Sequence, residues 1–176
     1  MKKIVLFIVL TFQLFAYDDY IGLGAGYTQF NVATSTGDID NSGASFTLDL
    51  GHKYGNYGRF HANGTYVTHD NDIYSAGSFS VGYDFLVPIF DNTFELYAGP
   101  VMGYTAYKER DFSLSGLHYG GEVGVLFEMT NNLELEVGYN FLSQDKSTDT
   151  HTAKNTQTGY VQVNLFFDKE KYFRYE

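Results

Sequence analysis

From Tyr20 onward, apolar and polar side chains alternate along the chain with a period of two. Residues 44–51 show the pattern most clearly, since Ala, Phe, Leu and Leu alternate there with Ser, Thr, Asp and Gly. This period is typical of β-strands, and no segment repeats apolar residues every three or four positions over a helical length. Eight segments carry the alternation: 21–28, 44–51, 59–66, 78–85, 94–103, 118–127, 133–141 and 160–167. Pro100 cannot donate a ladder hydrogen bond, so we expect a bulge or local break there.

Residues 1–16, MKKIVLFIVLTFQLFA, have the layout of a secretory signal peptide. Two lysines precede an apolar run, and Ala16 is a small residue suited to the cleavage position. The run is shorter than the ~20 residues of a transmembrane helix, although an uncleaved N-terminal anchor stays an alternative. No later apolar run approaches that length, so a mature protein in a membrane must cross it as strands.

Composition narrows the remaining classes of protein. The chain has 176 residues, which suits one domain after the leader, residues 17–176. It has no Cys, which excludes disulfides, thiolate metal sites and a lipid anchor on Cys. Its formal charge of -10 repels nucleic-acid backbones, so we expect no nucleic-acid partner.

The segments between the alternating runs differ in length. Long polar loops are predicted at residues 33–41, 108–116 and 143–156, and tight turns around Gly55 and around residues 130–132. Short turns at one rim and longer loops at the other are typical of an up-and-down barrel in an outer membrane. An even number of strands places both ends of the barrel domain on the periplasmic side.

The apolar face decides between a membrane barrel and a soluble, lipocalin-like barrel. Large residues from all eight strands would overfill the interior of an eight-stranded barrel, whereas they fit when they face lipid. The other face is mostly Gly, Ser, Thr and Asn with isolated charges, which suits a narrow lumen. Tyr and Phe near the strand ends match the aromatic girdles of membrane barrels, and 18% of the residues are aromatic. We therefore predict an all-β, eight-stranded antiparallel transmembrane barrel.

Two segments resemble a known family. Residues 120–141, GGEVGVLFEMTNNLELEVGYNF, resemble the penultimate hairpin of small outer-membrane β-barrels of the OmpA-transmembrane and OmpX-like class, and residues 20–30, YIGLGAGYTQF, resemble their first strand. The resemblance implies the fold and an outer-membrane location, and says little about activity. Such proteins usually end on an aromatic residue, whereas nine residues, 168–176, follow Phe167 here. We interpret these as a periplasmic tail, with a longer or shifted last strand that includes Phe173 as the alternative.

Ionisable residues on the polar face are the candidate functional groups. Charges in a narrow lumen need partners, because isolated burial costs several kcal/mol. Arg59 is the obvious cation, and Glu95, Glu122 and Glu136 are its candidate partners in an ion-pair plug. A lining that binds or passes a small cation is the alternative. The predicted lumen set is Asp49, Arg59, His61, Asp84, Glu95, His118, Glu122, Glu128, Glu134 and Glu136.

A weaker hypothesis concerns hydrolysis. Ser115, His118 and Glu122 supply the components of a hydrolase triad, as in lipid A deacylases built on small barrels. The spacing argues against it, because Ser115 lies three residues before His118 and points to the other face of a regular strand. His52, His69 and His151 lie in different segments, so no metal-ligand spacing appears, and we expect neither a metal nor a cofactor.

These observations predict a non-enzymatic, monomeric barrel exported through the periplasm to the outer membrane. Its partners would be outer-membrane lipid, lipopolysaccharide and a surface ligand at the loops, because loops on a rigid scaffold carry recognition. The predicted role is structural, adhesive or another surface interaction. A small-solute porin or transporter is the alternative, and a lipid-modifying hydrolase is the third class.

Overall fold

Eight antiparallel strands form a closed barrel in which each strand pairs with its neighbours in chain order and β8 pairs with β1. The computed structural model describes residues 18–34, 37–68, 75–90, 93–108, 113–147 and 151–167. The strands are β1 (Asp19–Thr34), β2 (Gly37–Tyr54), β3 (Gly58–Thr68), β4 (Ser75–Ile89), β5 (Phe94–Lys108), β6 (Ser113–Thr130), β7 (Leu133–Ser147) and β8 (His151–Phe167). The prediction of an eight-stranded antiparallel up-and-down barrel is confirmed. No helix among the described residues is long and apolar enough to span a membrane.

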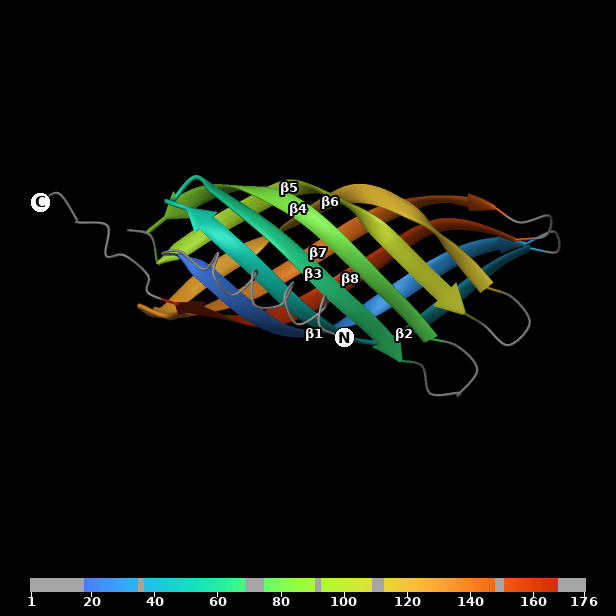
Figure 1. Cartoon of the computed structure of the whole chain (residues 1–176), viewed down its shortest axis with the longest axis horizontal. Helices are drawn as coiled ribbons and strands as arrows, with labels where there is room; N and C mark the ends of the chain where they lie inside the picture. Colours follow the sequence, from blue (N-terminus) through green and yellow to red (C-terminus); the bar gives the residue numbers. More distant parts are fainter. Residues whose placement is uncertain are drawn as a thin grey trace, which may run out of the picture.

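The barrel is elongated and its strands tilt against the long axis (Figure 1). Asp19 pairs with Phe167, so the first and last strands begin and end at the same end of the barrel. We call this the turn end, because the short connections at residues 55–57, 90–93 and 131–132 also lie there. Gly55 has a φ of +59° in the first of these turns, a conformation that glycine adopts without steric cost. The opposite end, where β1 passes to β2, is the loop end.

Alternation along each strand sorts side chains to two faces. Large apolar side chains face outward, for example Leu23 (67% exposed), Phe79 (59%) and Phe85 (61%), while their polar neighbours on the same strands face the lumen. The predicted orientation of the two faces is therefore the observed one. In the described strands, an apolar exterior surrounds a closed ladder that pairs the backbone polar groups almost throughout, and such pairing is the condition for crossing a membrane.

The predicted length of three loops is wrong, namely those at residues 33–41, 108–116 and 143–156. β1 runs to Thr34 and β2 starts at Gly37, so most of residues 33–41 forms paired strand, as in the pairs Val32–Ile39 and Asn31–Asp40. Similarly, β6 starts at Ser113, β7 runs to Ser147 and β8 starts at His151. Neighbouring strands satisfy the backbone hydrogen bonds of these polar segments, so turn-forming composition did not produce loops.

Pro100 interrupts one ladder without shifting it. β4 and β5 pair up to Gly82–Val101 and again from Phe85–Ala98, with the same register on both sides of the gap. The expected local break is therefore present on the β4 side, and no bulge accompanies it. The leader (1–16), the connection at 69–72 and the tail (168–176) lie outside the described residues.

Candidate functional site

The lumen contains a network of buried charges centred on Arg59, which is 1% exposed. Its Nη1 donates to Glu136 Oε2 over 2.7 Å, and its Nε and Nη2 donate to Asp84 Oδ2 over 2.8 and 2.6 Å. The guanidinium also lies over the ring of Tyr97, 4.8 Å from its centroid. A planar guanidinium can bind two carboxylates and an aromatic face at once, and this cluster therefore links β3, β4, β5 and β7 across the barrel.

A second cation lies nearer the turn end. Lys53 Nζ is 2.6 Å from Glu95 Oε2 and 2.8 Å from Glu134 Oε2, and all three side chains are almost fully buried. Because β2, β5 and β7 carry these residues, the ammonium joins three strands that are not neighbours. Phe166 lies beneath the ammonium at 5.8 Å and closes the lumen further toward the turn end.

Neutral polar side chains complete the network around Glu136. Asn164 Nδ2 donates to Glu136 Oε2 over 2.9 Å, and the Tyr160 hydroxyl donates to Oε1 over 3.1 Å. The hydroxyls of Tyr97 and Tyr160 are 2.8 Å apart above the cross-strand pair Gly124–Gly138. These donors stabilise a buried carboxylate that a single guanidinium leaves only partly satisfied.

His61 is surrounded by carboxylates from three other strands. Its Nε2 is 2.5 Å from Glu122 Oε1 and 3.8 Å from Asp84 Oδ2, and its Nδ1 is 3.6 Å from Asp49 Oδ1. His61, Asp84 and Glu122 are each at most 4% exposed. The sequence predicted no metal site, yet one ligand atom from each of these three residues lies within 4.8 Å of the others.

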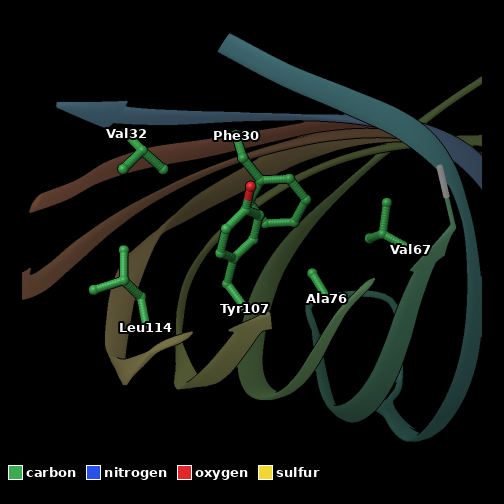
Figure 2. Packing of buried hydrophobic residues seen from close by; sticks show 6 residues of the cluster. All are labelled: Phe30, Val32, Val67, Ala76, Tyr107 and Leu114. Carbon is green, nitrogen blue, oxygen red and sulfur yellow. The ribbon is translucent and has the colours of Figure 1, made fainter. Parts of the chain in front are cut away.

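At the loop end the lumen is closed by apolar side chains instead of charges. Figure 2 shows six residues that converge inside the barrel, which we call the apolar cap: Phe30, Val32, Val67, Ala76, Tyr107 and Leu114. The rings of Phe30 and Tyr107 meet across the lumen with centroids 5.5 Å apart. Asn41 donates to the Tyr107 hydroxyl over 2.7 Å, which satisfies the one polar group of the apolar cap.

The predicted ion-pair candidates all lie in the lumen, but only one of them binds Arg59. Glu136 pairs with Arg59, whereas Glu95 pairs with Lys53 and Glu122 with His61. Of the other lumen residues expected from the sequence, Glu128 is half-buried near the turn end and the rest are buried.

The structure does not bring Ser115, His118 and Glu122 together. Ser115 pairs with exposed Ala106 and shares the outward face of Leu117, while His118 and Glu122 point inward. The ring nitrogens of His118 lie 3.0 Å from Ser80 Oγ and 2.8 Å from Thr105 Oγ1. A buried imidazole between two hydroxyls, with both nitrogens engaged, has neither an acid to orient it nor access to a substrate.

Sequence reasoning missed Lys53 as a lumen cation and Asp84 as a partner of Arg59. Lys53 continues the inward series of Asp49 and Gly51, but it lies beyond the alternating run 44–51, where the predicted strand ends. Asp84 was placed in the lumen, yet which carboxylate reaches Arg59 depends on registers around the whole barrel.

The outer surface changes from apolar to polar side chains near one end of the barrel. Toward the loop end of β1, β2 and β8, polar residues line a recess of about 120 Å³: Gln29, Asn31, Asp40, Asn41, Ser42, Asn155 and Gln157. We call this the amide recess. At the border of the amide recess that faces the turn end, the Tyr27 hydroxyl is 2.5 Å from Ser42 Oγ. There the Tyr139 hydroxyl also donates to Gln157 over 2.5 Å. Tyrosines that join apolar and polar bands mark the water boundary of membrane barrels.

Solved structures share this architecture. The crystal structure of Neisserial surface protein A (NspA) superposes with a TM-score of 0.67 at 16% identity, over 85% of this chain and 97% of that one. Outer membrane protein H (OprH) from P. aeruginosa gives 0.62 at 20% identity, over 85% and 99%. The outer membrane enzyme PagL gives 0.51 at 12% identity, over 84% and 99%. No protein-family model and no curated protein matches the chain.

The chain has the fold of the small eight-stranded outer-membrane β-barrels. Its outer-membrane location follows from that fold together with the apolar exterior of the closed ladder. Neisserial surface protein A and the outer membrane enzyme PagL share this fold, so the fold does not specify a role.

Proposed function

We propose that this chain is a surface protein of the outer membrane that acts by contact at its loop end, on a barrel whose lumen is closed. The filled lumen is the observation that carries this proposal. The Arg59 and Lys53 networks occupy the middle and the turn end, and the apolar cap occupies the loop end. A barrel filled in this way is a rigid scaffold for its outer surface.

The small size of two voids in the described lumen supports the same proposal. Two voids among the described lumen residues measure about 20 Å³ each, one beside Arg59 and His61 and one beside Phe30 and Thr28. A void of that size has room for about one water molecule. The two voids share the lining residues Asn63, Thr65, Asn140 and Thr158. A small-solute porin needs a far wider aqueous path than voids of this size supply.

The amide recess is where we place the contact. The side-chain amides of Asn31 and Asn155 and the carboxylate of Asp40 offer hydrogen-bond donors and acceptors side by side, on paired strands instead of a loose loop. Rigid elements hold such groups in place more accurately than loops do. This chemistry suits a hydroxyl-rich ligand such as a glycan, whose hydroxyls both donate and accept.

Attachment of whole cells tests the contact role. Cells that display the full chain are applied to surfaces coated with a panel of glycans, and retention is compared with cells that lack the chain. The triple variant Asn31→Ala, Asp40→Ala, Asn155→Ala is expected to reduce retention to the level of cells without the chain. Thr68→Ala, an exposed residue near the loop end of β3, is the control and is expected to retain attachment. Equal retention by the triple variant and the wild type would refute the amide recess as the contact.

Conductance in planar bilayers separates this proposal from the porin alternative. The refolded chain is expected to give no steady channel, whereas steady and sizeable openings would favour transport.

The hydrolase is the weakest of the three roles, because Ser115 and His118 face opposite sides of β6. Analysis of lipid A acylation in cells that express the wild type or His118→Ala is expected to give identical profiles. A change that depends on His118 would support the enzyme.

A further inference from the structure

The lumen of the described barrel contains more negative than positive charge. Its buried carboxylates are Asp49, Asp84, Glu95, Glu122, Glu134 and Glu136, and its buried lysine and arginine are Lys53 and Arg59. Lys53 pairs with Glu95 and Glu134, and Arg59 pairs with Asp84 and Glu136. Asp49 and Glu122 are left with His61 as their cationic partner, although Asp49 also accepts hydrogen bonds from Tyr20 and Gln162. Unbalanced buried charge is costly, so this part of the lumen calls for a further cation.

Buried imidazole and carboxylate atoms gather at this place. Within the described part of the chain, Nε2 of His61, Oδ1 of Asp84 and Oε1 of Glu122 are buried and have no aligned hydrogen-bond partner. Nε2 of His61 nevertheless approaches Oε1 of Glu122 to 2.5 Å. A nitrogen and a carboxylate oxygen at this separation need positive charge between them, which either a proton on the imidazole or a bound cation supplies.

Two glycines make room for the cluster. A Cβ at Gly82 would overlap Nε2 of His61 and lie 3.3 Å from Oε1 of Glu122, and a Cβ at Gly99 would lie 2.6 Å from Oδ1 of Asp84. The three ligand-bearing residues come from β3, β4 and β6, so the site exists only in the closed barrel.

We infer that His61, Asp84 and Glu122 bind a divalent transition-metal ion inside the lumen. One imidazole nitrogen and two carboxylate oxygens are ligands that Zn²⁺ accepts, at distances of about 2.0–2.2 Å. The neighbouring void of about 20 Å³, lined in part by His61 and Glu122, has room for a single water as a fourth ligand. The ion would supply the missing positive charge and join three strands, so its role would be structural.

A protonated His61 would balance part of the same charge without a metal, and the experiment must separate the two. The full barrel is refolded in detergent micelles in metal-free buffer and titrated with Zn²⁺ by calorimetry. One ion is expected to bind per barrel, and the urea midpoint of unfolding is expected to rise with Zn²⁺ and fall again with a chelator. Co²⁺ in place of Zn²⁺ is expected to give a visible absorption spectrum typical of a four-coordinate nitrogen and oxygen site.

Matched variants assign the ligands. His61→Gln and Glu122→Gln are expected to abolish stoichiometric binding, whereas His118→Gln is expected to preserve it, because His118 is a buried lumen histidine between hydroxyls. If the ligand variants fail to fold, the cobalt spectrum of the wild type and the effect of the chelator on its stability still show whether the barrel binds a metal ion. Absence of Zn²⁺ binding and of a cobalt spectrum in the folded wild type, or binding unchanged in His61→Gln, would overturn the metal site and leave an imidazolium only.

Discussion

Nη1 of Arg59 donates a 2.7 Å hydrogen bond to Oε2 of Glu136, which joins β3 to β7 directly across the lumen. Both side chains are 1% exposed, and Asp84 occupies the remaining side of the guanidinium. This one contact connects opposite walls of the barrel, and it explains why the centre of the molecule is closed although it is lined by charge.

Arg59→Met should strongly destabilise the barrel. The change leaves Asp84 and Glu136 buried without their cation, which costs about 3–5 kcal/mol when one partner of a buried pair is removed. Urea unfolding in detergent or lipid, followed by the heat-modifiable gel shift of folded barrels, measures the loss. Lys108→Met removes an exposed cation from the end of β5 and should change stability by no more than about 0.5 kcal/mol. Equal urea midpoints for Arg59→Met and the wild type would show that the Arg59 network does not stabilise the barrel.

The double variant Arg59→Met, Glu136→Gln tests whether the two residues act as a pair. Removing both charges should cost less than the sum of the single changes, because the second substitution removes a carboxylate that the first had left unpaired. The same unfolding measurement gives the coupling. Additive losses would show that Arg59 acts mainly through Asp84.

The sequence predicted the strands and the facing of their middle parts because both follow from a period of two, which a register shift of two residues does not change. It did not predict strand length at the loop end. There the apolar side chains of Phe30 and Val32 face the lumen and the polar ones of Gln29 and Asn31 face outward, so the phase of the alternation reverses while the ladder continues. Composition then resembles a loop although the backbone is paired.

The sequence did not predict which carboxylate pairs with Arg59 in the lumen, for a different reason. Arg59 and Glu136 are 77 residues apart, and they meet because successive registers around the barrel bring β3 and β7 to the same level. A shift of two residues in any ladder would keep the period and present Arg59 to other groups. The His61, Asp84 and Glu122 cluster depends on the same registers, so ligand spacing along the chain could not reveal it.

Gly138→Val should destabilise the barrel by steric overlap. A Cβ at Gly138 would collide with the hydroxyl of Tyr97 and the ring of Tyr160, which lie above the Gly124–Gly138 pair. Overpacking of this kind costs about 1–3 kcal/mol. Gly64→Val is the control, since Gly64 faces outward and a Cβ there meets its nearest atom at 4.0 Å. Comparable urea midpoints for Gly138→Val and Gly64→Val would show that the lumen has more free space than described.

Tyr107→Ala should weaken the apolar cap. The change removes the ring that meets Phe30 and leaves Asn41 without its hydrogen-bond acceptor, with an expected loss of about 3–5 kcal/mol. Thermal unfolding in detergent measures it. Tyr104→Ala is the control. Tyr104 lies three residues earlier on the outward face of β5 and is 49% exposed, so its removal should cost much less stability. A larger loss for Tyr104→Ala would contradict the assignment of Tyr107 to the barrel interior.

Fluorescence quenching by lipid tests whether neighbouring residues near the end of β8 face opposite sides of the barrel wall. The chain contains no Trp, so Phe166→Trp and Phe167→Trp each give a single probe at nearly the same depth. Phe166 is 2% exposed inside the lumen and Phe167 is 45% exposed on the outer surface. In bilayers of lipids brominated on the acyl chains, the probe at 167 should be strongly quenched and the probe at 166 should be nearly unaffected. Equal quenching of both, or stronger quenching at 166, would contradict a barrel with an apolar exterior and a filled polar lumen.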